Sequence, residues 1–272
     1  MTERSENLQT IRESEDFDFE RLIGRKANNL QSLRVILTGA SRGIGRAIAV
    51  RLAIAGCNLA LFARDAEALE ETVDLCRAAS HVYSFKKANI STFICDVTDT
   101  KYLADCFDAA TDDLGGLDVL INNAGIALRT DIGSALPHQI DSLIDVNLKS
   151  VMHLSRQAVP LLRKSGGATR AIINISSIAG QQTYRGGGLY CATKWGLQGF
   201  TQALFKDVRE DGIKVSSICP GYTNTAINWN KDRDLSKMLQ PEDVAEAAIW
   251  VLQYPNNGCP REIVIEAQKD PR

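Results

Sequence analysis

The chain alternates short apolar runs with stretches of helical periodicity, and this alternation restricts the fold more than any other feature of the sequence. Apolar strands separated by amphipathic helices are typical of a parallel sheet that is covered on both faces. We therefore expect an α/β fold made of a single doubly wound domain, with about seven strands and helices on both faces. The expected strands lie at 35–37, 58–63, 93–95, 119–121, 171–175, 215–218 and 262–265, and the expected helices near 44–56, 65–79, 99–112, 136–164, 188–210 and 241–253.

The N-terminal stretch differs in character from the rest of the chain. Residues 1–32 are polar, contain an acidic run at 13–20 and show no strong helix or strand period. A segment of this kind remains flexible or docks loosely on the domain. Because no later shift in composition marks another boundary, we expect a polar N-terminal extension at 1–32 and one domain at 33–272.

Composition excludes several classes of function. A net charge of −2 argues against non-specific nucleic-acid binding, and no apolar run is long enough to span a bilayer. The N-terminus lacks the apolar core of a secretory signal. The seven cysteines are dispersed and the three histidines form no cluster at a metal-binding spacing. We expect a cytoplasmic protein with reduced thiols and no metal, nucleic-acid partner or membrane span.

A glycine-rich turn follows the first expected strand. Residues 38–45 read TGASRGIG and lead into the first expected helix. Glycines allow a tight turn and let a pyrophosphate approach backbone amides at a helix N-terminus. The spacing is G-x-x-x-G-x-G rather than G-x-G-x-x-G, and the same pattern fits a ligand-free turn. Its place between a strand and a helix favours dinucleotide binding.

The end of the second strand bears on the choice of cofactor. An acidic side chain there would hold a ribose hydroxyl and repel a 2′-phosphate. This chain has Arg64 at that position, followed by Asp65, and Arg42 lies in the glycine turn. A guanidinium binds phosphate with its planar fork, whereas the alternative is a solvated Arg64 and an Asp65 that caps the next helix. We therefore expect NADP(H) rather than NAD(H).

Tyr190 and Lys194 form a potential acid–base pair in the helix expected near 188–210. Four residues along a helix put both side chains on one face, about 6 Å apart along the axis. A free tyrosine has a pKa of about 10, and a nearby ammonium would lower that pKa toward neutrality. Such a pair can donate a proton to a carbonyl or accept one from an alcohol. By itself the spacing also fits a solvated helix face.

Several motifs occur together in a fixed order, and their combination resembles the short-chain dehydrogenase/reductase family over roughly 34–265. The resemblance implies a Rossmann-type fold and hydride transfer between a nicotinamide cofactor and a carbonyl or alcohol. The C-terminus lacks the glycine-rich ending of many members, and the segment that usually covers the substrate, near 225–239, is short and charged. The motifs are residues 38–45, Asp96 with Val97, residues 122–125, Asn147, Ser176 with Ser177, residues 190–194, and Pro220 with Gly221.

The same resemblance implies four catalytic residues. Tyr190 would exchange the proton, and Lys194 would lower the tyrosine pKa and grip the nicotinamide ribose. Ser177 would orient the substrate oxygen; Ser176 is the rival, but strand alternation and the spacing to Tyr190 favour Ser177. Asn147 would hold a water in the proton relay, although a hydrogen bond inside its helix is the alternative.

The expected cofactor site collects residues from the carboxyl ends of the strands. In the family, the pair after the third strand borders the adenine, the turn after the fourth contacts the ribose, and the turn after the sixth fixes the carboxamide. Tyr190 and Lys194 also face the nicotinamide side. The full expected set is Gly39, Ser41, Arg42, Gly43, Ile44, Gly45, Arg64, Asp96, Val97, Asn123, Ala124, Gly125, Tyr190, Lys194, Pro220, Gly221, Thr223 and Thr225.

Three functional hypotheses follow from these residues. The first is an NADP(H)-dependent carbonyl reductase similar to 3-oxoacyl-thioester and small ketone reductases. The second is an NAD-linked alcohol dehydrogenase, and the third is a non-catalytic NADP(H)-binding sensor or scaffold. The resemblance also implies a small-molecule substrate and a homodimer or homotetramer joined through the helices that carry Asn147 and Tyr190.

Overall fold

The structure is a computed structural model that describes residues 30–83, 88–167, 169–227 and 234–271. Most of the expected extension at 1–32 and the centre of the segment near 225–239 therefore lie outside the described residues. The described chain begins at Leu30, which is buried in the core. The Sγ of Cys57 lies 3.2 Å from the Leu30 carbonyl oxygen, so this residue is joined to the domain that follows it.

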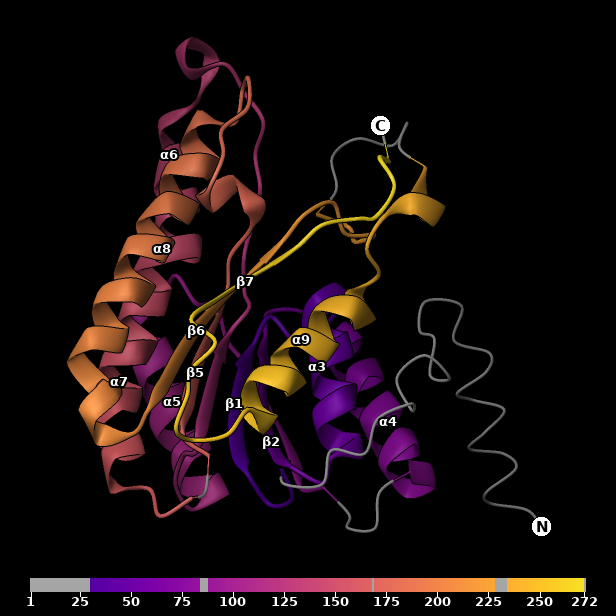
Figure 1. Cartoon of the computed structure of the whole chain (residues 1–272), viewed down its shortest axis with the longest axis vertical. Coiled ribbons are helices and arrows are strands. Elements are labelled where there is room, and N and C mark those ends of the chain that lie inside the picture. Colours follow the sequence, from indigo (N-terminus) through magenta and orange to yellow (C-terminus); the bar gives the residue numbers. More distant parts are fainter. Residues whose placement is uncertain (1–29, 84–87, 168, 228–233, 272) are drawn as a thin grey trace.

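Seven parallel strands form one sheet in the order β3-β2-β1-β4-β5-β6-β7 (Figure 1). This confirms the expected doubly wound fold. The central strands are apolar on both faces because helices cover them on both sides. The strands are β1 (Arg34–Thr38), β2 (Asn58–Ala63), β3 (Ile90–Ile94), β4 (Val119–Asn122), β5 (Ala171–Ile175), β6 (Lys214–Pro220) and β7 (Glu262–Ile265).

Helices cover both faces of the sheet. In Figure 1, α3, α4 and α9 lie on one side of the strands, and α5, α6, α7 and α8 lie on the other. The helices are α3 (Gly43–Ile54), α4 (Ala66–Tyr83), α5 (Thr100–Leu114), α6 (Pro137–Ile144), α7 (Ser150–Lys164), α8 (Gly188–Val208) and α9 (Pro241–Gln253).

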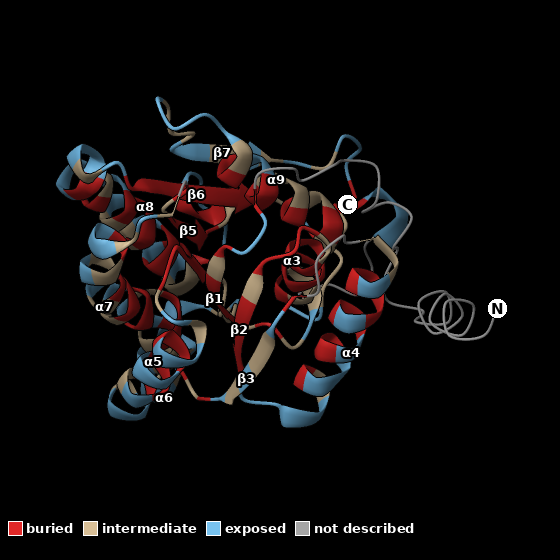
Figure 2. Cartoon of the chain, turned by 90° about the horizontal axis from the view of Figure 1, so that it is seen from below, coloured by how far each residue is buried: buried red, intermediate tan, exposed pale blue. Residues whose placement is uncertain are grey.

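Each face of the sheet has its own apolar core. Val35 and Leu37 of β1 pack toward α3, α4 and α9, whereas Ile36 packs toward α5, α7 and α8. This division follows from the two-residue alternation of a strand. Figure 2 shows the strands buried at the centre, with exposed residues on the outer faces of the helices. Because the sheet is buried on both faces, it is a rigid support for the loops at the carboxyl ends of its strands.

The strand order reverses between β1 and β4, and this reversal positions the site. The chain runs outward from β1 through β2 to β3, then crosses to β4 and continues through β5 to β7. The loops after β1 and β4 therefore separate, which leaves a crevice at the carboxyl ends of the strands. Most of the residues singled out by the sequence lie in those two loops or at the ends of β2, β3, β5 and β6.

An ion pair joins β1 to β4 at the amino ends of these two strands, away from the crevice. The Arg34 guanidinium donates to Asp118 at 2.7 Å and 2.9 Å, and the Arg34 backbone amide donates to the same carboxylate at 2.9 Å. Asp118 is nearly inaccessible, with 3% exposure. Burial opposes ionisation, but the bonds from Arg34 and Ser165 outweigh it and lower the pKa of Asp118. The pair fixes the register of the two strands at the reversal.

Two expected elements differ in the structure. The helix expected at 136–164 is divided by a π-helical turn, η2 (Asp145–Lys149), between α6 and α7. Apolar periodicity does not reveal a single wide turn, because the pattern continues on both sides of it. Strand β3 begins at Ile90 rather than near residue 93. Ser91 and Thr92 are polar, so the apolar run in the sequence marked only the second half of the strand.

Candidate active site

The glycine turn places the start of α3 at the mouth of the crevice. Gly39 and Gly43 adopt φ values of +67° and +55°, which favour glycine. A Cβ on Gly45 would lie 2.1 Å from the Gly39 carbonyl oxygen, so only glycine fits there. Arg42 is the N-cap and provides no side-chain hydrogen bond to the first turn of α3. The first amides of this helix consequently have no side-chain cap and suit an anion.

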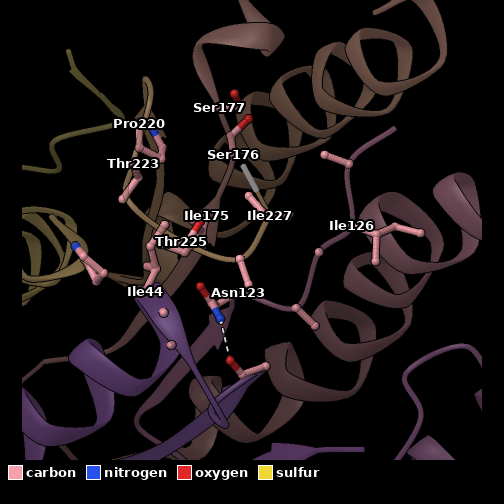
Figure 3. Close-up of a pocket in the computed structure, with 18 of the residues that line it drawn as sticks. Ile44, Asn123, Ile126, Ile175, Ser176, Ser177, Pro220, Thr223, Thr225 and Ile227 are labelled. Carbon is pink, nitrogen blue, oxygen red and sulfur yellow. Dashed lines mark hydrogen bonds between the residues drawn. The ribbon is translucent and has the colours of Figure 1, made fainter. Parts of the chain in front are cut away.

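Asn123 locks the glycine turn to the end of β4. Its Nδ2 donates to the carbonyl oxygens of Thr38 and Gly39, both at 3.0 Å. Figure 3 marks one of these two bonds. The Thr38 hydroxyl in turn accepts from the backbone amides of Asn123 and Ala124 at 3.0 Å and 3.1 Å. Two loops on either side of the strand reversal are thereby held together. Asn123 acts as a brace in addition to lining the cavity.

A cavity of about 2000 Å³ opens from this turn along the carboxyl ends of the strands. It is lined by every residue of the expected cofactor set and by Ser177 of the expected catalytic set. The structure thus brings together residues separated by as much as 186 positions, from Gly39 to Thr225. Figure 3 shows Ile44, Asn123, Ser177, Pro220 and Thr225 around the same space.

The cavity has features that fit a dinucleotide. The Thr225 hydroxyl is buried and has no hydrogen-bond partner among the described residues. It lies beside the glycine turn, since a Cβ on Gly43 would be 3.1 Å from the Thr225 methyl carbon. An unpartnered buried hydroxyl is costly unless a ligand completes its bonding. Together with the uncapped amides of α3, it makes this end of the cavity suitable for a pyrophosphate and its neighbouring groups.

Arg64 follows β2, and Asp96 lies after β3, the neighbouring strand. The Arg64 NH1 lies 3.3 Å from the Asp96 Oδ2, and both side chains are exposed. Asp96 also accepts from the backbone amide and hydroxyl of Thr98 at 2.9 Å and 2.8 Å. Burial opposes ionisation, but the bonds from Thr98 and Arg64 lower the pKa of Asp96. The guanidinium expected to meet a 2′-phosphate is therefore held by a neighbouring carboxylate.

Tyr190 lies in the first turn of α8, beside Ser177 at the end of β5. The two side chains hydrogen-bond to each other, and Ser177 Oγ also accepts from the Ala179 amide at 3.1 Å. Burial raises the pKa of Tyr190 to about 12, and the bond from Ser177 only partly offsets that effect. The direction is opposite to the one expected from Lys194 in the sequence. At neutral pH the phenol keeps its proton.

Lys194 is buried beneath the cavity, one helical turn after Tyr190. Its Nζ donates to the Ile175 carbonyl oxygen at 3.0 Å and lies 5.8 Å from the centre of the Tyr190 ring. Burial lowers the pKa of Lys194 to about 8, because desolvation penalises the ammonium. The ammonium points to the strand end rather than to the phenol, and this explains why it does not dominate the tyrosine pKa.

Asn147 lies behind the cavity wall, within the π-helical turn η2. Its amide spans two elements: Oδ1 accepts from the Ile126 amide at 2.9 Å, and Nδ2 donates to the Ile126 carbonyl at 2.8 Å and to Thr193 Oγ1 at 3.2 Å. The side chain is 1% exposed. Its contacts brace the segment after β4 against α8, so its hydrogen bonds reach beyond its own helix. Its Oδ1 would lie 3.5 Å from a Cβ on Gly125, which lines the cavity.

Several residues that line the cavity were not predicted from the sequence. The additional lining residues include two tyrosines, Tyr184 and Tyr222, and the tail that follows β7. The tail returns to the site because the Asp234 amide donates to the Pro271 carbonyl at 3.1 Å. An aromatic residue shortly before Tyr190 was a usable signal, but a polar C-terminal tail carries none. The tail contributes Glu266, Ala267, Asp270 and Pro271.

No three His, Cys, Asp or Glu side chains among the described residues are arranged to hold a metal ion. Within the same residues, no helix combines the length and apolar character needed to cross a membrane.

Comparison with known proteins gives a consistent result. A family model described as short chain dehydrogenase matches residues 34–236. An oxidoreductase of Staphylococcus saprophyticus is 34% identical over 237 residues, which cover 87% of this chain and 97% of that protein. A short chain dehydrogenase from Burkholderia cenocepacia, solved in complex with NADP, has a TM-score of 0.75 and 29% identity over 89% of this chain and all of that one. Carveol dehydrogenase from Mycobacterium avium, solved with NAD, has a TM-score of 0.79 at 23% identity, over 88% of this chain and 98% of that one, and supports the fold alone.

Proposed function

The chain belongs to the short-chain dehydrogenase/reductase family, and on that premise we propose that it transfers a hydride between NADP(H) and a ketone or 3-oxoacyl-type carbonyl. The observation that carries the proposal is a single cavity shared by Ser177, Tyr190, Lys194 and the glycine turn. A structural turn or a solvated Tyr–Lys pair would not require these groups to converge. An oxidoreductase that uses a nicotinamide cofactor does.

The catalytic roles follow from the protonation states of these side chains. The nicotinamide supplies the hydride when bound. With a pKa of about 12, Tyr190 is a neutral phenol at pH 7 and can donate its proton to the oxygen of a carbonyl. Ser177, which hydrogen-bonds to that phenol, orients the same substrate oxygen. In the reverse direction the same pair would take the proton from the hydroxyl of an alcohol.

Lys194 and Asn147 act on either side of the reacting groups. Lys194 lies within hydrogen-bonding range of the end of β5 and lines the cavity, where it can hold a ribose hydroxyl. Asn147 keeps Ile126 and α8 at a fixed separation through its two-ended amide. In this proposal the asparagine positions the cavity wall and holds a water of the proton relay.

Replacement of Tyr190 tests the reaction type. Turnover of a panel of ketones and 3-oxoacyl thioesters would be followed by nicotinamide absorbance with both NADPH and NADH. We expect Tyr190→Phe to bind cofactor normally and to lose about 10²-fold or more in kcat, the usual contribution of a positioned acid. The control is Tyr102→Phe, an exposed tyrosine on α5. Near-normal turnover by Tyr190→Phe would refute the assignment.

Two cationic residues support NADP(H) as the cofactor. Arg64 and Arg42 both line the cavity, and Arg64 stands where an acidic residue would favour NAD(H). The Burkholderia relative was solved with NADP. The contact between Arg64 and Asp96 favours the competing NAD-linked hypothesis, because the guanidinium must leave a carboxylate to meet a phosphate.

Cofactor titration separates these alternatives. We expect NADPH to bind more tightly than NADH, with Arg64→Ala weakening NADPH by about tenfold and leaving NADH nearly unchanged. Arg77→Ala is the matched control, since Arg77 is an exposed arginine of α4 paired with Glu70. An equal effect of Arg64→Ala on both cofactors would favour the NAD-linked reading. Cofactor binding without turnover of any carbonyl or alcohol would favour the sensor or scaffold hypothesis.

Assembly and location are further parts of the proposal. A homodimer or homotetramer joined through the helices around Asn147 and Tyr190 is checked by light scattering of the purified protein. A cytoplasmic location is checked by cell fractionation. A monomer or a membrane-bound protein would overturn the corresponding expectation.

A further inference from the structure

Three side chains outside the proposed catalytic set meet behind Ser177. Gln181 follows the 3-10 turn η3 (Ile178–Gly180), which begins directly after Ser177. Gln198 lies one helical turn beyond Lys194 in α8, and Glu262 begins β7. Strand β7 is the last strand of the sheet and lies next to β6 (Figure 1).

One carboxylate oxygen of Glu262 accepts hydrogen bonds from both Gln181 and Gln198. Gln198 Nε2 donates to Glu262 Oε1 at 2.7 Å, and Gln181 Nε2 donates to the same oxygen. Gln198 is only 5% exposed. Its Oε1 has no partner among the described residues, and its Nε2 otherwise contacts Cys219 Sγ at 3.4 Å. The bond to Glu262 is therefore the main interaction that orients this buried amide.

The serine turn (residues 177–181) also lies directly against α8 at this place. A Cβ on Gly180 would lie 2.9 Å from the Lys194 carbonyl oxygen and 3.0 Å from Gln198 Cγ. The turn thus rests directly on the backbone of the helix that carries Tyr190 and Lys194. Its amides are held mainly within the turn itself, with Gly180 donating to Ser177 at 2.9 Å and Gln181 donating to Ile178 at 2.9 Å. Those local bonds do not determine where the turn sits on the helix.

We propose that Glu262 is a positioning residue that holds the serine turn on α8. By accepting from Gln181 on the turn and Gln198 on the helix, its carboxylate fixes the separation between Ser177 and Tyr190. The catalytic part of this inference rests on the proposed function, whereas the holding of the turn does not.

The geometry also indicates which replacement should succeed. Both amides donate to one oxygen, and a carbonyl oxygen has two lone pairs. A glutamine at position 262 can therefore accept both bonds without a charge, and an alanine can accept neither. Glu262 is itself exposed on the edge strand, so its removal opens no cavity in the core.

Hydrogen exchange tests the holding of the turn without any need for turnover. We expect Glu262→Ala to speed exchange of the 178–182 amides by about tenfold or more, as expected when a local opening becomes easier. Exchange in α3 should not change. Glu262→Gln should exchange as wild type does, and Val264→Ala, another exposed residue of β7, is the matched control. Unchanged exchange in Glu262→Ala would overturn the proposal.

Kinetics on a carbonyl that the wild type reduces test the catalytic consequence. Glu262→Ala should lower kcat by about 10- to 100-fold, because misplacement of a catalytic group by a fraction of an ångström is costly. Cofactor affinity should stay within about twofold, since the glycine turn is untouched, and Glu262→Gln should restore kcat. Normal kcat in Glu262→Ala, or a failed rescue by Glu262→Gln, would refute the positioning role. Absence of wild-type turnover on the whole panel would refute the proposed function instead, and the exchange result would still decide whether Glu262 holds the turn.

Discussion

The burial of Lys194 predicts that the cofactor-free protein bears a stability cost that depends on pH. The perturbation is Lys194→Met, which keeps an unbranched side chain of similar length and removes the ammonium. Burial lowers the pKa of Lys194 from an ordinary value of 10.5 to about 8. A lysine whose pKa is lower in the folded than in the unfolded chain disfavours folding below the folded pKa. That cost disappears as the pH rises toward the unfolded pKa.

The size of the effect follows from the two pKa values. Each pKa unit corresponds to about 1.4 kcal/mol, so the full cost below pH 8 is about 3 kcal/mol. About 1 kcal/mol of this cost is removed between pH 7 and pH 9, and the remainder by about pH 11. Lys194 Nζ, which donates to the Ile175 carbonyl, has N–H groups to donate in both protonation states. Loss of this bond shifts the variant by a nearly constant amount and leaves the pH trend intact.

Thermal or urea unfolding of cofactor-free protein at pH 7, 8 and 9 measures this trend. The free energy of unfolding of wild type should rise relative to Lys194→Met by about 1 kcal/mol from pH 7 to pH 9, or about 2–4 °C in Tm. Other titrating groups are shared by both proteins and cancel in the difference. Lys206→Met controls for the same change on the exposed face of the same helix.

Two results would contradict the reasoning. A stability difference that is constant from pH 7 to pH 9 would mean that Lys194 is solvated in the folded protein. A difference that changes in the opposite direction would mean that a buried anion holds the ammonium.

Three further changes have definite expected outcomes. Gly45→Ala should lower cofactor affinity by about 10²-fold, measured by fluorescence titration, because its methyl meets a backbone carbonyl at 2.1 Å; normal affinity would mean that the turn can shift. Thr225→Val should raise the stability of cofactor-free protein by about 1 kcal/mol and weaken cofactor binding, since it removes an unpartnered buried hydroxyl; unchanged affinity would remove Thr225 from the site. Asp118→Ala should lower the free energy of unfolding by about 3 kcal/mol by stranding Arg34, whereas Asp211→Ala, from an exposed pair, should lower it by less than about 1 kcal/mol; equal losses in denaturant unfolding would refute the distinction.

Much of the fold could be predicted from the chain because its strands are buried on both faces. That burial produces continuous apolar runs, and every expected run corresponds to a strand of the sheet. Strand β3 was only partly recognised since it lies at the sheet edge and carries Ser91 and Thr92 in its first half. The π-helical turn at Asn147 was missed because one additional residue in a turn barely changes an apolar pattern.

The site was predictable to a different degree. Residues in turns that follow strands could be placed together, because the carboxyl ends of parallel strands share one edge. The direction of the Tyr190 pKa could not be predicted, since it depends on burial and on where the Lys194 ammonium points. The pairing of Arg64 with Asp96 and the role of Glu262 were also beyond reach, because both depend on tertiary contacts between distant residues.

The lock formed by Asn123 has a consequence for how the molecule acquires its site during folding. Its amide bonds to Gly39, which lies 84 residues earlier in the chain. The two residues follow β4 and β1, which pair with each other in the sheet. A contact of such long sequence separation forms only after a large loop has closed. The cradle for the cofactor is therefore absent from a nascent chain that has not yet placed β4. Because the cofactor can bind only after this site has formed, it should stabilise the native state and slow unfolding. It should not accelerate the earliest steps of folding.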